Sequence, residues 1–395
     1  MGHVLFAWEL GENLGHLSRD LPIATRLKQA GHRVTCVAAN LRIAAGIFAK
    51  SDIPFVQAPI LRQSPRAPNR SVSHAEIAMA AGYSDTNSLR GLVGGWHGLI
   101  GMARPDVLVA DYAPTAIVSA RITRTPVVLI GNGFEIPPRV KPLPPFPSLG
   151  SVTDARLIHS EELVLNNVNE ILAEWNTQPL PCFADCFYSE RRLLTTFAEL
   201  DHFGMRPSEE YVGPIFDVPQ ARAVQWNKDT GQKRIFAYLR QWMPRIQDLL
   251  AALRASEADI ICSSPDLPDE LVRRFSSSRL RIFRDAVALS PLLGSADLVI
   301  AYGAGTVAAS LLSGVPLLLI PRWAEQHLTA IRAEVTGAAL VSRSHGPPSS
   351  YPALIQRLLC DEKYREAAQQ FAERHASFSH ENAVSHVAST IVETM

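Results

Sequence analysis

Short apolar runs along the chain alternate with longer segments whose apolar residues have helical spacing. In the first half, such runs predict strands at residues 3–8, 33–38, 54–56, 106–110 and 126–130. Residues 17–29 have the spacing of a helix that ends at Gly31, and Asn40 is suited to capping the helix after the second strand. Continuous apolar runs such as 106–110 are typical of parallel strands buried on both faces. The alternation therefore predicts a doubly wound α/β domain.

The same alternation restarts after a polar, proline-bearing stretch at residues 206–232. The second half has predicted strands at residues 234–239, 259–262, 280–283, 298–301 and 315–320. From Tyr351 onward the pattern is helical. We therefore predict two Rossmann-like domains, at residues 1–212 and 234–395, joined by a linker at 213–233.

A glycine turn at residues 302–306 lies between a predicted strand and a predicted helix. The free N–H groups and the dipole of a helix N-terminus favour an anion, and Gly303 and Gly305 let a phosphate approach the backbone. Past the next strand come Glu325 and Gln326, an acid and an amide suited to hydrogen-bonding sugar hydroxyls. A phosphate at one strand end and hydroxyls at its neighbour predict a nucleotide-sugar pocket.

This segment resembles the donor-binding motif of the GT1-like UDP-glycosyltransferase family, whose members have the GT-B fold. The matching positions are Tyr302, Gly303, Gly305, Thr306, Gly314, Val315, Pro316, Pro321, Glu325 and Gln326. Where the family usually has a histidine that touches the donor diphosphate, this chain has Tyr302. A tyrosine hydroxyl still donates a hydrogen bond but carries no positive charge at neutral pH. Ser310 stands where the family has an acid.

The loop after the first strand also resembles the start of GT1 enzymes, with Gly15, His16 and Pro22 in place. The resemblance implies that His16 takes the proton from the acceptor hydroxyl, and an imidazole suits this role because its pKa lies near the operating pH. The alternative is a histidine that caps the helix beginning at Leu17. The G-x-G-x-x-G spacing of a dinucleotide site is absent from this loop.

A histidine base needs an acid that fixes its tautomer and stabilises the imidazolium. Asp111 ends the strand 106–110 on the side where ligands bind, and in the family an aspartate at this strand end pairs with the histidine. The alternative is that Asp111 caps the helix near Pro114. Glu12 and Asp20 are rivals because they lie close to His16 in the sequence.

Further donor contacts are expected in the second half. Arg240, after the strand 234–239, is a hypothesis for the positive charge that Tyr302 lacks, with a surface arginine as the alternative. Residues 283–289, which include Val287, occupy the place where the family holds the nucleotide base by backbone contacts. The tryptophan that the family has there is absent, so UDP- and dTDP-linked donors both stay open.

The D-x-D motif of metal-dependent glycosyltransferases is also absent, and we expect no metal.

Composition narrows the class of protein. A length of 395 residues favours two domains, and 38 basic against 38 acidic residues argue against a sequence-independent nucleic-acid binder. The five cysteines are odd in number and scattered, and Cys182 and Cys186 lack a second pair at metal spacing. We expect reduced thiols in a cytoplasmic protein. The chain shows no leader and no long apolar window, so we expect no membrane span, while peripheral membrane contact stays open.

We therefore interpret the chain as an inverting, metal-independent hexosyltransferase of the GT-B fold, with two domains facing a central cleft. The resemblance implies that the N-terminal domain holds a small-molecule or lipid acceptor, that the C-terminal domain holds the nucleotide sugar without a cofactor, and that the last helix crosses back onto the N-terminal domain. One alternative is a non-catalytic GT-B module that binds a nucleotide sugar or a partner protein, which Tyr302 favours. Another is a sugar-nucleotide epimerase of the same fold, which the motif around His16 disfavours.

Overall fold

The chain divides into two compact units. The computed structural model describes residues 1–11, 14–61, 68, 70–146, 152–216, 221–227, 231–343 and 350–395. Unit 1 comprises Met1–Asp217 and Ser379–Met395, and unit 2 comprises Val218–Phe378. The boundary falls inside the segment 213–233 that we expected to be a linker, of which residues 217–220 and 228–230 lie outside the described residues.

Unit 1 is built on a six-stranded parallel sheet with the strand order β3-β2-β1-β4-β5-β6. The strands are β1 (His3–Trp8), β2 (Arg33–Ala38), β3 (Phe55–Gln57), β4 (Val107–Asp111), β5 (Val127–Gly131) and β6 (Arg191–Leu194). The direction of winding reverses between β1 and β4, and α/β proteins bind ligands at such a switch point. The register pairs Trp8 with Asp111, so the carboxyl ends of β1 and β4 lie side by side.

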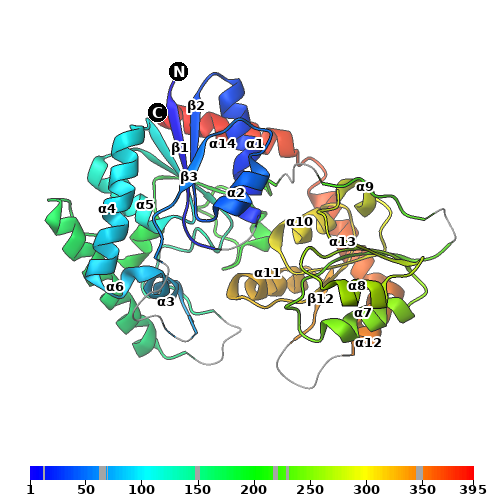
Figure 1. The fold of residues 1–395 in the computed structure, drawn as a ribbon. Helices are drawn as coiled ribbons and strands as arrows, with labels where there is room; N and C mark the ends of the chain where they lie inside the picture. Colours follow the sequence, from blue (N-terminus) through cyan, green and yellow to red (C-terminus); the bar gives the residue numbers. More distant parts are fainter. Residues whose placement is uncertain are drawn as a thin grey trace. The chain divides into compact units, whose positions relative to one another are not determined.

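Helices cover both faces of this sheet (Figure 1). They are α1 (Gly15–Gln29), α2 (Leu41–Ile47), α3 (His74–Ala78), a π-helical turn (Met79–Tyr83), α4 (Thr86–Ala103), α5 (Pro114–Thr123), α6 (Asp154–Glu174), two 3₁₀ turns (Phe183–Phe187 and Ala198–Leu200) and α14 (His380–Thr394). One face packs against α4 and α5, where Trp96 and Ile117 meet Leu108 of the sheet in a buried core. Helices α1, α2 and α14 lie on the other face.

The last helix, α14, packs against α1 within unit 1. Its buried side includes Val384, Val387 and Ile391. Arg26 of α1 forms an ion pair with Glu381 and donates a hydrogen bond to Ser385 Oγ at 2.6 Å. The end of the chain therefore supports the helix that carries His16.

Unit 2 repeats the architecture of unit 1. Its parallel strands are β7 (Arg234–Tyr238), β8 (Asp259–Ser263), β9 (Leu280–Phe283), β10 (Leu298–Ala301), β11 (Leu317–Leu319) and β12 (Ala339–Val341). Their order is β9-β8-β7-β10-β11-β12, which is the same relative order as in unit 1. The switch point here lies between β7 and β10. The prediction of two doubly wound, Rossmann-like domains is confirmed.

The helices of unit 2 also lie on both faces of its sheet (Figure 1). They are α7 (Ile246–Ala255), α8 (Asp269–Phe275), α9 (Ser290–Leu293), α10 (Ala304–Leu312), α11 (Ala324–Val335), α12 (Tyr351–Cys360) and α13 (Glu362–Arg374). Leu249 of α7, Leu271 of α8 and Ile355 of α12 pack into one buried core with strand residues such as Ile300. On the other face α10 packs against α13.

Candidate active site

His16 lies just beyond β1, on the first turn of α1. The helix begins at Gly15 after the N-cap residue Leu14, which makes no side-chain cap bond, so the interpretation of His16 as a helix cap is wrong. The imidazole is 8% exposed. It stacks with the ring of Trp8, with centroids 5.2 Å apart, and with the ring of Tyr112 at 6.4 Å. These contacts restrict the ring to one orientation.

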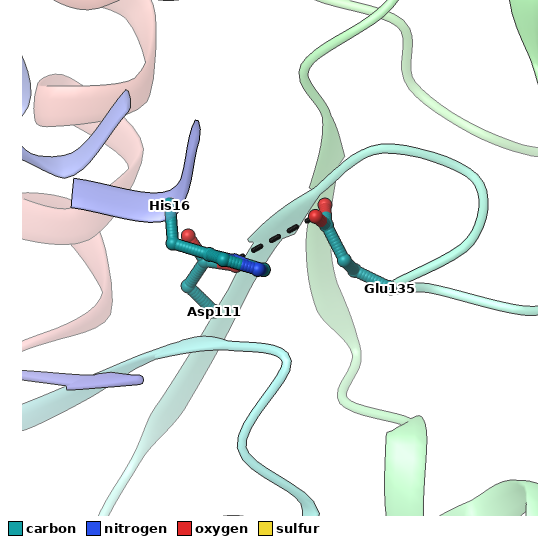
Figure 2. A group of neighbouring side chains, drawn as sticks. All are labelled: His16, Asp111 and Glu135. Carbon is teal, nitrogen blue, oxygen red and sulfur yellow. Dashed lines mark hydrogen bonds and ion pairs between the residues drawn. The ribbon is translucent and has the colours of Figure 1, made fainter. Parts of the chain in front are cut away.

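The structure brings His16 and Asp111 into contact, as the resemblance implies. His16 Nδ1 lies 2.8 Å from Asp111 Oδ1, and Asp111 is fully buried at the end of β4 (Figure 2). An ionised carboxylate only accepts hydrogen bonds, so Nδ1 carries the proton and Nε2 keeps its lone pair. The alternative role of Asp111 as a cap is wrong, because the carboxylate that accepts from the Thr115 N–H of α5 belongs to Glu9, at 2.9 Å.

The guanidinium of Arg19, one turn along α1 from His16, joins this pair. Its Nε and Nη2 donate to Asp111 Oδ2 and Oδ1 at 3.2 and 2.5 Å. Its Nη1 donates to Thr195 Oγ1 at 3.2 Å and lies 2.9 Å from Glu135 Oε2. Arg19 was not predicted from the sequence, although a spacing of three residues on a helix places two side chains on the same face.

Glu135 is the second carboxylate next to His16, and the sequence analysis missed it as well. It lies in a tight turn after β5, in which Asn132 Oδ1 accepts from the Phe134 N–H at 2.9 Å and Glu135 Oε2 accepts from the Asn132 N–H at 2.5 Å. Glu135 Oε1 lies 3.6 Å from His16 Nδ1 (Figure 2). A turn closed by Gly131 and Gly133 with an acid behind it is the signal that was available in the sequence.

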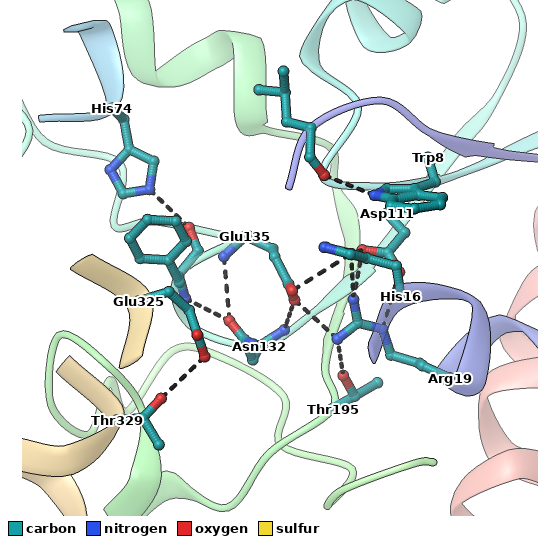
Figure 3. A network of polar contacts seen from close by, with 12 residues as sticks. Trp8, His16, Arg19, His74, Asp111, Asn132, Glu135, Thr195, Glu325 and Thr329 are labelled. Atoms are coloured by element: carbon teal, nitrogen blue, oxygen red, sulfur yellow. Dashed lines mark hydrogen bonds and ion pairs between the residues drawn. The ribbon is translucent and has the colours of Figure 1, made fainter. Parts of the chain in front are cut away.

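These side chains form one buried cluster, which we call the histidine site. Its members are His16, Arg19, Asp111, Glu135 and Thr195 (Figure 3). The histidine and the arginine come from α1, and the other three come from the ends of β4, β5 and β6 or the turns that follow. Because β4, β5 and β6 adjoin in the sheet, their carboxyl ends converge at this place.

The two acids of the histidine site increase the affinity of His16 for a proton. Burial by itself lowers the pKa of His16, but Asp111 and Glu135 together raise it above its ordinary value of 6.5. Burial opposes the ionisation of Asp111, yet Arg19 and His16 lower its pKa to about 2. Burial and the neighbouring Asp111 raise the pKa of Asp20, which disfavours the charged form of this rival acid. Glu12, the other rival, lies outside the described residues.

Ligand atoms of His16, Asp111 and Glu135 lie within 4.8 Å of one another, a spacing that a metal ion can use. In this cluster, however, Arg19 is ion-paired with both carboxylates. The cation that these acids surround is therefore a guanidinium, and the arrangement suits proton transfer by the imidazole.

Gly11 lies beside the free nitrogen of the imidazole. Its φ is +85°, and a Cβ at this position would stand 2.5 Å from His16 Nε2. Only glycine combines this backbone conformation with such a close approach. Gly11 therefore places no side chain against the nitrogen that would accept a proton.

In unit 2, the predicted phosphate site lies at the switch point between β7 and β10. Helix α10 begins at Ala304 after the N-cap residue Gly303, and no side-chain hydrogen bond caps this end. The first-turn amides, which include those of Gly305 and Thr306, have no partner within the helix. This end of α10 therefore has the geometry of an anion site.

Tyr302 packs into the core of unit 2. Its ring stacks on Tyr238, with centroids 5.2 Å apart, and meets the edge of Trp242 at 5.1 Å. Burial, assisted by Tyr238, raises the pKa of Tyr302 far above its ordinary value, although Arg240 opposes the rise. The side chain is therefore neutral and adds no charge to the phosphate site.

Arg240 lies near Tyr302, but its guanidinium is ion-paired with Asp266. Its Nε donates to Asp266 Oδ2 at 3.0 Å, and the other oxygen of Asp266 accepts from the Gln241 N–H at the same distance. A second arginine, Arg322, follows β11 and was missed by the sequence analysis. Its guanidinium lies over the rings of Trp242 and Trp323 at 5.4 and 4.6 Å.

Glu325 and Gln326 differ in their surroundings. Glu325 is half-buried, and its Oε1 accepts from Thr329 Oγ1 at 3.1 Å (Figure 3). Gln326 is buried, and its Oε1 accepts from the Arg322 and Trp323 N–H groups at 3.0 and 3.4 Å. The Gln326 oxygen therefore caps the start of α11, whereas the Glu325 carboxylate keeps an exposed part.

Val287 lies in a short bridge with Arg222. The Arg222 N–H donates to Ala286 O at 2.7 Å, and the Ala288 N–H donates to Arg222 O at 3.0 Å. These bonds use the groups on either side of Val287. The amide and carbonyl of Val287 itself point away from the bridge, as the backbone alternation of an extended strand requires.

Part of the sequence matches a known protein family. Residues 247–392 match the family model described as erythromycin biosynthesis protein CIII-like, C-terminal domain. A search of curated proteins found no match. Among the described helices, none combines the length and the apolar character needed to cross a membrane.

Solved glycosyltransferase structures are similar over nearly the whole chain. VinC in complex with dTDP has 16% identity and a TM-score of 0.70, with 99% of this chain and 100% of that chain covered. The spinosyn rhamnosyltransferase SpnG has 18% identity and a TM-score of 0.69, with 98% and 100% covered. The calicheamicin glycosyltransferase CalG4 has 17% identity and a TM-score of 0.72, with 98% of each chain covered.

The chain therefore has the GT-B fold of glycosyltransferases. The resemblance to GT1-like glycosyltransferases that the sequence predicts is confirmed by the fold and by the similarity of residues 247–392 to the erythromycin biosynthesis protein CIII-like C-terminal domain.

Proposed function

We propose that this protein is a glycosyltransferase that moves a sugar from a nucleotide-diphosphate sugar to an acceptor hydroxyl with inversion at the anomeric carbon. The observation that carries the proposal is the buried contact of 2.8 Å between His16 Nδ1 and Asp111 Oδ1 at the switch point of unit 1. This contact leaves Nε2 as the nitrogen with the lone pair, and Gly11 places no side chain against it.

In the proposed reaction, His16 Nε2 accepts the proton of the acceptor hydroxyl as its oxygen attacks the anomeric carbon. The new bond joins that oxygen to the sugar, and the bond between the anomeric carbon and the β-phosphate oxygen breaks. The nucleoside diphosphate leaves with the electron pair. Asp111 stabilises the imidazolium that forms.

Unit 2 would hold the donor. The start of α10 at Gly303, Gly305 and Thr306 would bind the diphosphate through backbone N–H groups, so no metal is required. Because Tyr302 is neutral, the positive charge next to the diphosphate would come from Arg240 and Arg322. Glu325 would accept hydrogen bonds from sugar hydroxyls.

The comparisons support a choice between the two donor classes left open by the sequence. VinC was solved with dTDP, and SpnG was solved both with thymidine diphosphate and with the spinosyn aglycone. By similarity to these proteins, we propose a dTDP-linked sugar as donor and a small-molecule aglycone as acceptor. Backbone groups of Val287 would then contact the base.

A donor screen tests the proposal. The purified chain is incubated with dTDP- and UDP-sugars and a mixture of hydroxylated aglycones, and nucleotide release and glycoside formation are measured together. We expect release that depends on an aglycone, and His16→Ala should reduce it by about 100-fold or more. Binding of dTDP without any turnover would favour the non-catalytic module, and an epimerised donor without glycoside would favour an epimerase.

A further inference from the structure

Asp111 is already ion-paired with Arg19 before His16 takes up a proton. Arg19 donates two hydrogen bonds to the two oxygens of Asp111, and both side chains are buried, with 7% and 0% exposure. A cation at this distance weakens the field that an aspartate exerts on its histidine partner. With Arg19 present, Asp111 alone would therefore stabilise an imidazolium less well than it does in a simple histidine–aspartate pair.

Glu135 adds a second carboxylate next to His16 and Arg19. Its Oε2 forms an ion pair with Arg19 Nη1 at 2.9 Å, and its Oε1 lies 3.6 Å from His16 Nδ1 (Figure 3). With His16 neutral, one guanidinium and the carboxylates of Asp111 and Glu135 leave one net negative charge at the site. Once His16 accepts a proton, the site is neutral.

The chain is built to hold Glu135 in this place. A Cβ at Gly131 would stand 2.9 Å from both Cβ and Oε2 of Glu135, so the glycine leaves the space that the glutamate occupies. The Asn132 N–H fixes Oε2 at 2.5 Å. Thr195, whose N–H donates to Gly131 O at 2.7 Å, holds the other side of the Arg19 guanidinium.

The other ionisable groups around His16 do not change this sum. On α1, Asp20 is buried beside Asp111, and on β2, Cys36 is buried beside Asp20; burial raises the pKa of both and so favours their uncharged forms. Tyr112, after β4, is neutral for the same reason. The charged partners of His16 are therefore Asp111, Arg19 and Glu135.

We propose that Glu135 is a positioning residue whose negative charge offsets the positive charge of Arg19, so that Asp111 and Glu135 together stabilise the protonated form of His16. The charge state of His16 is then set by three residues from three elements. This inference rests on the proposed function for its catalytic meaning, since only a transferase uses His16 as a base.

The test measures the pKa of His16 by NMR in the full chain with ¹³Cε1-labelled histidine, with the signal assigned by its loss in His16→Ala. Glu135→Gln should lower this pKa by about one unit, because opposite charges at this distance shift pKa values by one to three units. Arg19→Gln should raise it, and the double variant should return it close to the wild-type value. Glu135→Asp keeps the charge and should restore most of the shift.

Glu76→Gln is the matched control, because Glu76 is also buried and ion-paired to an arginine, Arg156, outside the histidine site. It should leave the His16 pKa unchanged. The proposal is overturned if Glu135→Gln leaves that pKa within about 0.2 units of the wild type, or if the control shifts it equally. If Glu135→Gln fails to fold, an unchanged or lowered pKa in Arg19→Gln overturns the proposal instead.

Activity supplies the second measurement. In Glu135→Gln the acidic limb of the kcat/KM profile should move to lower pH together with the NMR pKa. The NMR titration needs no substrate, so the charge proposal can succeed in a protein that transfers no sugar. Conversely, sugar transfer with an unresponsive His16 would remove the role of Glu135 and leave the proposed function in place.

Discussion

The proposed base and its acid are 95 residues apart in the sequence and in contact in the structure. The reason is the strand order, because β1 and β4 adjoin and Trp8 pairs with Asp111. The ion pair between Arg19 and Asp111 adds a positive charge that a simple histidine–aspartate pair lacks. Substitutions at this site therefore change the charge balance as well as a single hydrogen bond.

Asp111→Asn should lower kcat by at least about tenfold, because the amide stabilises the imidazolium less well than the carboxylate. The variant should also move the acidic limb of the kcat/KM profile to lower pH, since Asp111 raises the pKa of His16. Steady-state rates between pH 5 and pH 9 provide the measurement. A loss of melting temperature with unchanged kcat per folded molecule would instead assign Asp111 a structural role.

The same substitution has a consequence for acid stability. The pKa of Asp111 is about 2, below its ordinary value of 3.8, so its ionisation stabilises the fold above pH 4. This contribution is lost as the pH falls through 2. The free energy of unfolding of Asp111→Asn should accordingly change less than that of the wild type between pH 4 and pH 2.

Arg240→Ala should weaken nucleoside diphosphate binding by about tenfold or more, as expected for a hydrogen bond to a charged group. Nucleoside binding should change little. Because the contact is ionic, the wild-type affinity for the diphosphate should fall with salt. Calorimetric titrations of both ligands provide the measurement, with Arg254→Ala on the exposed side of α7 as the control.

The ion pair of Arg240 with Asp266 makes this experiment discriminating. If the diphosphate affinity of Arg240→Ala equals that of the wild type, the arginine serves only Asp266 and the positive charge comes from elsewhere. Arg322, held between Trp242 and Trp323, is the next residue to substitute in that case.

Glu325→Ala should weaken a nucleotide sugar more than the free nucleoside diphosphate. The half-buried carboxylate is assigned to sugar hydroxyls, and each lost hydrogen bond costs about 1–3 kcal/mol. Calorimetry with dTDP and with a dTDP-sugar measures the two affinities separately. An equal loss for both ligands would place Glu325 away from the sugar.

The sequence predicted the parts of the site that carry a local motif. Gly303 and Gly305 follow an apolar strand, and His16 stands in a glycine loop, so their surroundings are visible in a short window. Arg19 and Glu135 carry only weak local signals, a helical spacing from His16 and a glycine turn before an acid, and neither signal names a partner, because the partners depend on which strand ends adjoin. That information resides in the strand order and not in any short segment.

At the scale of elements, the central strands were predicted and the edge strands β6 and β12 were not. Central strands such as β4 are buried on both faces, and their continuous apolar runs stand out. β6 begins with Arg191 and Arg192, and β12 has only three residues. The other two edge strands, β3 and β9, were predicted, so an edge position by itself does not hide a strand. In β6 the charged start interrupts the apolar pattern.

Gln326→Ala is a prediction about an element, because the Gln326 oxygen caps the start of α11. Losing a helix cap typically costs about 1 kcal/mol. We therefore expect a lower melting temperature for Gln326→Ala and little change in stability for Glu325→Ala. Thermal unfolding of both variants without ligand provides the measurement. Normal stability together with a loss of sugar affinity would return Gln326 to the role that the resemblance implied.

At the scale of the whole molecule, the two units have the same strand order and place their candidate residues at equivalent points. His16 follows β1 and Asp111 ends β4 in unit 1, while Arg240 follows β7 and Gly303 follows β10 in unit 2. Under the proposed function, the same relative strand order would supply a proton-transfer site in one unit and an anion site in the other. The two sites differ in their side chains and share their position in the sheet.

The proposed donor site in unit 2 predicts which backbone amides a bound nucleotide protects from hydrogen exchange. With dTDP at about 100 times its dissociation constant, the binding unit gains about 2.7 kcal/mol of stability. Hydrogen exchange in the full chain should therefore slow most in unit 2, and within it at the start of α10 around residues 303–306. Thymidine alone, which lacks the phosphates, should protect the segment around Val287 but not residues 303–306. Protection by dTDP that is confined to α1 and the turn at Glu135 would contradict the donor site and require the two roles to be exchanged.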